Sequence, residues 1–231
     1  MIRKGLAFSF LFMVIMTGFS IYGWLELGPD SRIPVHWGLN GEVDRYAGRF
    51  EGLVMMPLLA LFLSGLLAAL PLIDPRGANL RKSEPAYLAC WIGVLALLTG
   101  VQALIILTAT GHIAASDPEL GQRAIAGGIG ALMLLIGNFL GKARPNWFMG
   151  IRTPWTLSSD LAWDKTHRLT GRLMVVVGAL AIVGAFALPA AFGFVLAMAA
   201  AMGPALIGVV YSYFVWRSDP QRETHNAGDG D

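Results

Sequence analysis

The chain has 231 residues, of which 55% are hydrophobic and only 14% are charged. Because soluble domains carry about 25% charged residues, this composition excludes an ordinary soluble protein, and the mean hydropathy of +0.60 agrees. The net charge of +2 provides no broad basic surface, so direct nucleic-acid binding is not expected.

The first apolar segment runs from Gly5 to Leu27, and its first charged residue is Glu26. Arg3 and Lys4 precede it, as basic residues precede the core of a secretory signal peptide. Signal-peptide cores are shorter, at about 7–15 residues, and are followed by a small-residue cleavage site that this segment lacks. We therefore expect a retained transmembrane helix.

A polar connection over residues 28–51 follows, and it is too long to be a plain turn. Asn40 and Gly41 form a dipeptide that is typical of two-residue hairpin turns, because both residues tolerate positive φ. The sequence therefore predicts a short extracytoplasmic hairpin around this dipeptide.

A two-residue turn fixes the register of that hairpin. Trp37 should lie opposite Asp44, and His36 opposite Arg45. Because side chains alternate between the two faces of a hairpin, Trp37 and Asp44 share one face, and His36 and Arg45 share the other. His36 and Asp44 would then point apart, which argues against a metal site that combines them with Glu42.

Two interpretations of the hairpin stay open. In the first, Trp37 and Tyr46 offer amphipathic contact area, and His36 and Asp44 offer polar groups, for recognising a ligand outside the cell. In the second, the two aromatic side chains anchor the connection at the membrane interface.

Further apolar windows follow in the chain. Residues 52–73, 86–110 and 124–141 reach or approach the roughly 20 residues that a membrane span needs. The window over 173–216 holds 44 uncharged residues, and as one helix it would be about twice as long as a hydrocarbon core. It must fold back on itself, and Pro189 marks the break. The sequence therefore predicts six transmembrane helices.

Glycine is frequent in the 124–141 window, and glycine lets helices approach each other closely, so we expect a central helix there. Asn138 lies inside this window, and Gln102 lies inside the preceding one. A polar side chain in a membrane is costly unless it is paired. Each is therefore expected to bond a neighbouring helix or backbone group, with substrate binding as the alternative.

The connection over residues 142–171 is irregular, aromatic and basic. Gly150 and Pro154 exclude a long helix in its first part. Ser158 or Ser159 can then cap a helix that continues directly into the fifth span. Asp164 and Arg168 are four apart and can pair on the surface of that helix, and Trp163 and His167 share another face of it.

This second connection also has two open interpretations. It forms either a structured cytoplasmic docking surface or the inner half of a binding site, or else its tryptophan and arginine side chains serve only as anchors at the lipid headgroups.

Lys and Arg are divided unequally between the two sides of the predicted spans. One side holds Arg3, Lys4, Arg76, Arg81, Lys82, Lys142, Arg144, Arg152, Lys165, Arg168, Arg172, Arg217 and Arg222, which are 13 of the 17. The other side holds Arg32, Arg45, Arg49 and Arg123. Because cytoplasmic loops carry the excess of basic residues, both termini are predicted to lie in the cytoplasm.

Each half of the chain has the order span, long connection, span, span, with the long connection outside in the first half and inside in the second. This order matches an inverted 3+3 arrangement, of the kind found in transporters, although chance explains the weak likeness of the two connections equally well. We divide the chain into 1–75 (two spans and the hairpin), 76–123 (the third span), 124–216 (the remaining spans) and a disordered polar tail at 217–231.

The two connections together resemble a known family. The signature of the SdpI family of bacterial membrane proteins is similar to the run Gly137, Asn138, Arg144 to Trp147, Gly150 to Leu157, Ser159, Trp163, Thr166 to Arg168 and Gly171. The small domain of unknown function that commonly precedes that signature resembles the outer motif of Pro34, His36, Trp37, Gly41 and Asp44.

The resemblance implies immunity against a secreted antimicrobial peptide toxin, with signalling through sequestration of a cytoplasmic repressor. It also implies a multi-pass protein of the bacterial cytoplasmic membrane, whose partners are the lipid bilayer, a peptide toxin outside and a repressor inside. Recognition outside is assigned to His36, Trp37, Gly41 and Asp44. Coupling or docking inside is assigned to Asn138, Asn146, Gly150, Arg152, Thr153, Pro154, Trp155, Trp163 and His167.

A small-molecule or peptide transporter or exporter is the alternative, suggested by the inverted order of spans and by Asn138. It is disfavoured because no Asp or Glu lies deep in a predicted span, where proton-coupled transport usually needs one. The sequence has no HExxH or GxSxG motif and no zinc-type spacing. No enzyme activity, metal or cofactor is therefore expected, and Cys90 is interpreted as a packing residue.

Overall fold

The computed structural model describes residues 1–38, 42–113 and 118–221. Within these ranges, six helices are long and apolar enough to cross a membrane, as the sequence predicts. They are α1 (Ile2–Glu26), α2 (Arg49–Ile73), α4 (Glu84–Ala109), α5 (Pro118–Leu140), α7 (Asp160–Ala187) and α8 (Ala190–Arg217). The other described elements are the short helices α3 (Gly77–Lys82) and α6 (Pro154–Ser158) and the strands β1 (Ile33–Trp37) and β2 (Val43–Ala47).

Helix α7 begins at a serine cap. The hydroxyl of Ser159 accepts the amide N–H of Ala162 at 2.9 Å, which satisfies one of the donors left free at a helix start. From there the helix continues into the fifth span without interruption. Asp164 and Arg168 form an ion pair of 3.0 Å on its surface. The predicted cap, continuous helix and ion pair are therefore confirmed.

The end of α7 is held by a side chain from α5. Arg123 Nη1 donates to the carbonyl oxygens of Ala185 at 2.9 Å and Leu188 at 3.0 Å. A cation at this position also interacts favourably with the negative end of the helix dipole. Pro189 follows as the cap of α8, so the long apolar window does fold back at the predicted proline.

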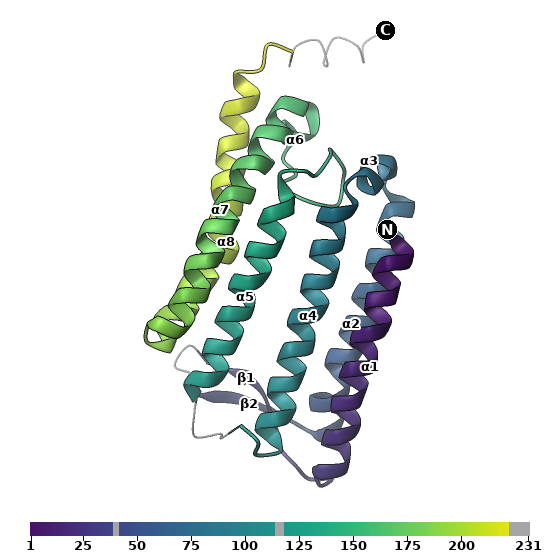
Figure 1. Ribbon diagram of the computed structural model, residues 1–231, viewed down its shortest axis with the longest axis vertical. Coiled ribbons are helices and arrows are strands. Elements are labelled where there is room, and N and C mark those ends of the chain that lie inside the picture. The colour runs from purple at the N-terminus through teal and green to yellow at the C-terminus, as the bar shows by residue number, and fades with distance from the viewer. Residues whose placement is uncertain (39–41, 114–117, 222–231) are drawn as a thin grey trace.

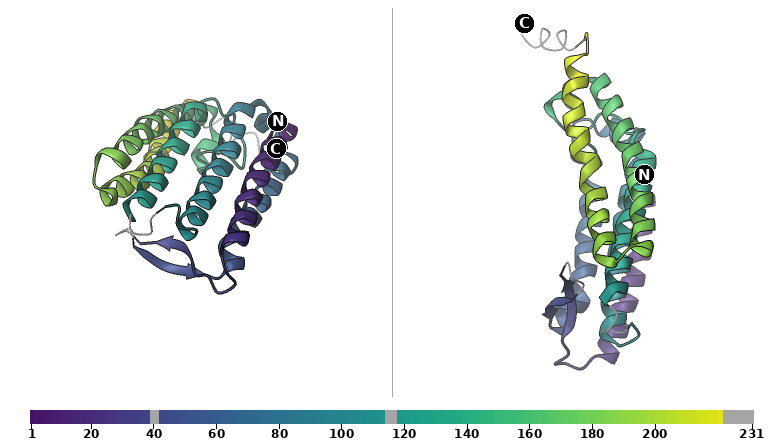
Figure 2. Two further views of the ribbon diagram at one scale, coloured as in Figure 1. Left: turned by 60° about the horizontal axis from the view of Figure 1, so that its bottom comes forward. Right: turned by 90° about the vertical axis from the view of Figure 1, so that its left-hand side faces the viewer.

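The six long helices form two groups of three (Figure 1). Helices α1, α2 and α4 pack together, α5, α7 and α8 pack together, and α4 contacts α5 across the boundary. The start of α1 and the end of α8 lie at one end of the bundle, and the β hairpin (β1 and β2) lies at the other (Figures 1 and 2). The absolute orientation of the bundle and the inverted relation between the two groups stay predictions.

Glycine lets α5 and α7 pack with their backbones in contact. A Cβ atom added to Gly178 would lie 2.7 Å from the carbonyl oxygen of Gly130, and one added to Gly171 would lie 2.7 Å from that of Gly137. Helix α5 also contacts α4 and α8. The prediction of a central glycine-rich helix is confirmed.

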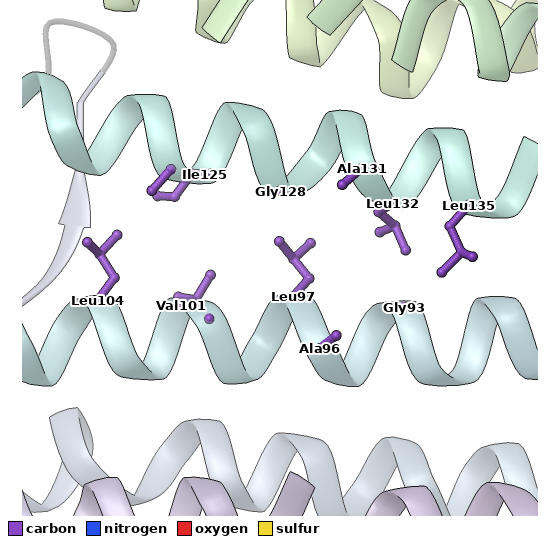
Figure 3. A pocket seen from close by; sticks show the side chains of 12 residues that line it. Gly93, Ala96, Leu97, Val101, Leu104, Ile125, Gly128, Ala131, Leu132 and Leu135 are labelled. Atoms are coloured by element: carbon purple, nitrogen blue, oxygen red, sulfur yellow. The ribbon is translucent and has the colours of Figure 1, made fainter. Parts of the chain in front are cut away.

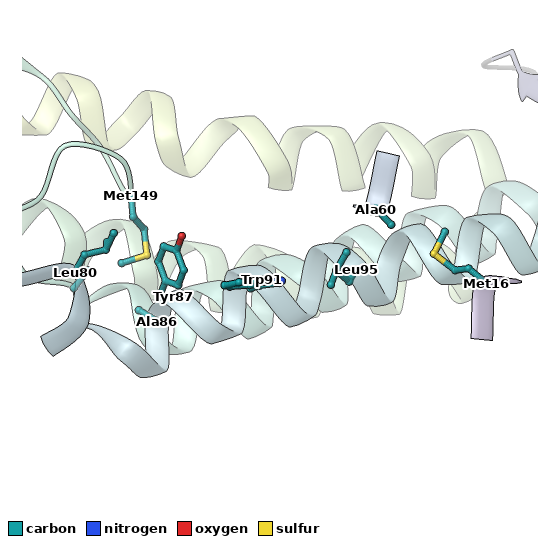
Figure 4. Packing of buried hydrophobic residues seen from close by; sticks show 9 residues of the cluster. Met16, Ala60, Leu80, Ala86, Tyr87, Trp91, Leu95 and Met149 are labelled. Carbon is teal, nitrogen blue, oxygen red and sulfur yellow. The ribbon is translucent and has the colours of Figure 1, made fainter. Parts of the chain in front are cut away.

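The core of the first group runs along α4 (Figure 4). Trp91 is fully buried there, and its indole N–H donates to Ser9 Oγ of α1 at 2.9 Å. Met149, from the connection between α5 and α7, packs into the same cluster near Tyr87. Cys90 packs against this cluster, in agreement with its interpretation as a packing residue.

Gln102 connects α4 to α1 and α2 through hydrogen bonds. Its amide nitrogen donates to the carbonyl oxygen of Leu53 at 3.1 Å and to Ser20 Oγ at 3.2 Å. The side chain is fully buried, and its oxygen has no hydrogen-bond partner within the described part of the chain. The expected bond to a neighbouring helix is confirmed.

Candidate functional site

Six of the 13 predicted site residues lie in the connection between α5 and α7, residues 141–159, which we call the α5–α7 connection, and Trp163 and His167 of α7 contact it. Asn146 organises its first turn. The Asn146 amide donates to the carbonyls of Arg144 at 2.9 Å and Met149 at 3.3 Å, and its oxygen accepts the N–H groups of Phe148 at 3.0 Å and Met149 at 2.6 Å. Because this side chain is fully buried, it replaces the hydrogen bonds that regular secondary structure would supply.

His167 holds the middle of the α5–α7 connection against α7. Its Nε2 accepts the amide N–H of Ile151 at 3.0 Å, and its Nδ1 lies 2.8 Å from the carbonyl oxygen of Trp163. A neutral ring with the proton on Nδ1 satisfies both contacts. The ring also stacks on Trp163, with centroids 4.0 Å apart, and the Trp163 indole N–H donates to the carbonyl of Ala143 at 2.8 Å.

Gly150 is the residue that lets the backbone pass over His167. It has a φ of +101°, and an added Cβ would lie 2.1 Å from His167 Nε2. Both observations require glycine, because larger residues rarely adopt this backbone conformation and no space is left for a side chain.

Thr153 connects the same segment to α8. It forms a reciprocal capping box with Thr156 at the start of α6, where Pro154 is the first helical residue. The Thr153 hydroxyl also lies 3.0 Å from Ser212 Oγ of α8. Trp155 meets the ring of Tyr213 edge to face, with centroids 5.2 Å apart. The α5–α7 connection is therefore fixed to both helices that follow it.

Arg152 and Trp147 form the exposed part of the α5–α7 connection. Arg152 is exposed, and its Nη1 donates to the carbonyl oxygen of Trp147 at 2.9 Å. The Trp147 side chain is 47% exposed. These two side chains are available to a partner at this end of the bundle.

Sequence reasoning missed the residues that hold the α5–α7 connection against the first group of helices. Asp74, which follows α2 and is 7% exposed, accepts the amide N–H of Trp147 at 3.1 Å. Asn79 of α3 donates to the carbonyl of Pro145 at 2.9 Å, and Ser83 Oγ accepts the N–H of Arg144 at 2.8 Å. These partners are more than 60 residues apart in sequence, so no local pattern could have indicated them.

Sequence reasoning also missed the role of Asp219. The sequence assigns it to a disordered tail, whereas its carboxylate is 7% exposed and accepts the hydroxyl of Ser159 at 2.5 Å. The same serine caps α7, so the end of α8 is fastened to the start of α7. Residues 222–231 of the predicted tail lie outside the described residues.

Asn138 does not make its expected bond. Its side chain is exposed and has no hydrogen bond to any residue that the structure describes. The reason is its place on α5: the preceding residue, Gly137, faces α7 in backbone contact, and successive residues of a helix point about 100° apart. Asn138 therefore lies at the edge of a groove between α5 and α7.

The β hairpin corrects the predicted register. His36 pairs with Arg45 as predicted, but Trp37 pairs with Val43 and not with Asp44. Two register shifts flank His36 and leave Asp44 as an extra residue in β2, and such a bulge turns a side chain toward the other face. His36 Nδ1 consequently lies 2.6 Å from Asp44 Oδ1, although the two were predicted to point apart.

The aromatic residues of the hairpin lie in different surroundings. Trp37 packs against the buried cluster around Ile33 and Leu53, whereas Tyr46 is exposed. Gly41, with the predicted turn around it, lies outside the described residues. Because the hairpin and the α5–α7 connection lie at opposite ends of the bundle (Figure 1), the predicted residues form two separate sites.

Two cavities differ sharply in character. A polar cavity of about 680 Å³ lies beside the α5–α7 connection, where Arg76, Lys82 and Arg144 line it together with Asp160 and Asp219. An apolar groove of about 300 Å³ lies between α4 and α5, and the described residues that line it are all Gly, Ala, Val, Leu or Ile (Figure 3). No three His, Cys, Asp or Glu side chains of the described residues converge as metal ligands would.

Comparisons with known proteins identify both motif regions. Residues 142–212 match the model of the SdpI/YfhL protein family, and residues 11–61 match that of a domain of unknown function, DUF1648. The first match contains the α5–α7 connection, α7 and most of α8; the second contains the hairpin. Asn138 lies outside both.

The chain is also similar to Immunity protein SdpI of Bacillus subtilis (strain 168). The two are 31% identical over 85 residues, which are 37% of this chain and 39% of that protein. The similarity thus spans about two fifths of the relative's length. No solved structure matches the chain.

Proposed function

We propose, on the premise that residues 142–212 are a region of the SdpI/YfhL family, that this multi-pass membrane protein protects the bacterium that makes it against a secreted peptide toxin. The observation that carries the proposal is the similarity to an immunity protein, 31% identical over 85 residues. The bacterial cytoplasmic membrane is the location that this function requires. No catalytic step is part of the proposal.

The two ends of the bundle take different roles in this proposal. The β hairpin faces outward and meets the toxin, and the α5–α7 connection faces the cytoplasm and docks a repressor. Lys and Arg are in excess at the end of the bundle that carries the α5–α7 connection, and this excess supports the orientation. The exposed Trp147 and Arg152 support a docking role, because tryptophan and arginine are enriched where proteins bind partners.

Helix α5 provides a physical link between the two ends. Near its start, Gln122 Nε2 donates to the carbonyl oxygen of Gly38, which directly follows β1. Its end leads directly into the α5–α7 connection, and its glycines lie in backbone contact with α7. A displacement of the hairpin by a bound peptide would therefore act on the helix that positions the docking surface.

Arg152→Ala is expected to abolish protection while leaving membrane insertion and protein level unchanged. The bond of Arg152 to Trp147 is exposed, so its loss should cost little stability, and the effect should come from the lost docking group. The measurement is the survival of a deletion strain that carries each variant, challenged with secreted peptides encoded by genes next to its own.

Lys165→Ala is the matched control, because Lys165 is an exposed cation on α7 at the same end of the bundle. It should retain full protection. Unchanged survival with Arg152→Ala, or an equal loss with Lys165→Ala, would count against a docking role for Arg152.

The orientation can be tested separately. In a Cys90→Ala background, which removes the single cysteine of the chain, His36→Cys and Arg152→Cys each place one thiol at an exposed position. A membrane-impermeant maleimide applied to intact cells should label the first variant at once, and the second only after permeabilisation. The opposite pattern would reverse the assignment of the two ends.

Transport stays the alternative, and the division into two groups of three helices favours it. Purified protein in proteoliposomes separates the two functions. If the protein takes up or exports a small molecule or peptide there and gives no protection in cells, the transporter replaces the immunity proposal.

A further inference from the structure

A groove of about 560 Å³ runs between α5 and α7 at the end of the bundle that carries the α5–α7 connection. Its floor consists of glycines. The contacts described above leave no room for side chains between the helices at Gly137 and Gly171, and a Cβ on Gly141 would lie 3.3 Å from the backbone of Arg168. The groove is therefore bounded by backbone below and by side chains only along its rims.

The rims of the groove are positively charged. Lys142, Arg168 and Arg172 line it, and all three are exposed. Arg168 is paired with Asp164, whereas Lys142 and Arg172 have no ion-pair partner within the described ranges. Among the residues that the structure describes, no acidic one lines the groove itself. The groove therefore attracts an anion.

The same two helices become apolar toward the middle of the membrane. On α7, Arg172 is followed at a spacing of four by Val176, which is 56% exposed, and then by Leu180. On the other rim, Lys142 lies two residues beyond the end of α5, and Asn138 of α5 is preceded at the same spacing by Leu134. Residues four apart lie on one face of a helix, so each rim runs from cationic at the headgroup level to apolar below it.

We propose that this groove binds one acidic phospholipid. Lys142, Arg168 and Arg172 hold the phosphate and the headgroup anion, Asn138 offers its amide to the same groups, and an acyl chain lies along Val175 and Val176. Charge and polarity change along the groove in the order in which they change along such a lipid. The inference needs only that α5 and α7 cross the membrane, so it is independent of the immunity proposal and of the orientation.

The test uses full-length protein purified in a mild detergent with equal amounts of phosphatidylglycerol and phosphatidylcholine, and counts retained lipids by native mass spectrometry. The wild-type protein should retain one phosphatidylglycerol in preference to phosphatidylcholine. Lys142→Gln with Arg172→Gln should weaken that retention roughly 25-fold, at about fivefold for each charge. Arg81→Gln with Lys82→Gln is the matched control, since it removes two exposed cations of α3 at the same end of the bundle.

Three outcomes would overturn the proposal. They are unchanged retention in the Lys142 and Arg172 double variant, an equal loss in the α3 control, and displacement of the lipid by millimolar inorganic phosphate, which would indicate a site for free phosphate. Asn138→Asp keeps the proposal testable if the double variant is unstable. It adds a carboxylate to an exposed side chain of the same size and should also lower retention of the acidic lipid.

Discussion

Gly150→Ala is expected to disrupt the α5–α7 connection and to destabilise the second group of helices. The new Cβ would lie 2.1 Å from His167 Nε2, on a backbone with φ of +101°. The backbone strain costs about 1–3 kcal/mol, and loss of the buried bond between Ile151 and the imidazole adds about 1–3 kcal/mol. Together they should lower the free energy of unfolding by about 2–6 kcal/mol. Unfolding in a denaturing detergent, followed by tryptophan fluorescence, measures this change.

Gly111→Ala is the control that separates strain from steric overlap. Gly111 also has a positive φ, of +78°, but no atom of the described residues lies within 4 Å of the position that its Cβ would occupy. It should show the strain cost alone. Adding His167→Ala to Gly150→Ala should cost less than the sum of the two single changes, because the smaller side chain removes the overlap. Equal effects of Gly150→Ala and Gly111→Ala would show that the close contact with His167 is unimportant.

The membrane spans could be predicted from the sequence because the backbone hydrogen bonds that form them lie within one segment of the chain. In lipid, each backbone group must find its partner inside the same segment, so a long apolar window has to be a helix. Pro189 ends one such helix by its own geometry. The spacing of four between Trp163 and His167 likewise predicted that they share one face of the helix, where the two rings stack.

The tertiary contacts of the α5–α7 connection could not be predicted in the same way. His167 was placed on the correct face of α7, but its bond to Ile151 depends on the positive φ of Gly150, which no periodicity reveals. The sequence analysis did not single out Asp74, and it assigned Asp219 to a disordered tail. Asp74 bonds a partner that the packing of the two helix groups brings near, and Asp219 bonds one that the packing of α8 against α7 brings near.

The hairpin shows another reason why part of the structure could not be predicted from the sequence. The pairing of His36 with Arg45 followed from counting residues outward from the turn. The count already fails nearer the turn, where Trp37 pairs with Val43, and Asp44, an extra residue in β2, makes it agree again at His36 and brings its own carboxylate to that side chain. A bulge leaves no signature in composition or alternation, so a register counted from the turn alone can fail at one pair and agree at the next.

Gly178→Val is expected to force α5 and α7 apart. The Cβ of residue 178 would lie 2.7 Å from the carbonyl oxygen of Gly130 and 2.8 Å from the backbone nitrogen of Leu134. Neither is a side-chain atom that can rotate away, so the helices themselves must separate. Because helices in lipid associate through close van der Waals packing, we expect the free energy of unfolding to fall by about 3 kcal/mol. The same detergent titration measures it.

Gly65→Val is the matched control, because Gly65 lies in the middle of α2 and nothing is within 4 Å of its Cβ position. It should leave stability almost unchanged. The contact of α5 with α7 continues from Gly178 through Gly171 to Gly141, the first residue of the α5–α7 connection. Gly178→Val should therefore also expose that connection to added protease, although the change lies several helical turns away. Equal stability and equal protease resistance of the two variants would show that glycine-mediated contact is not what holds α5 against α7.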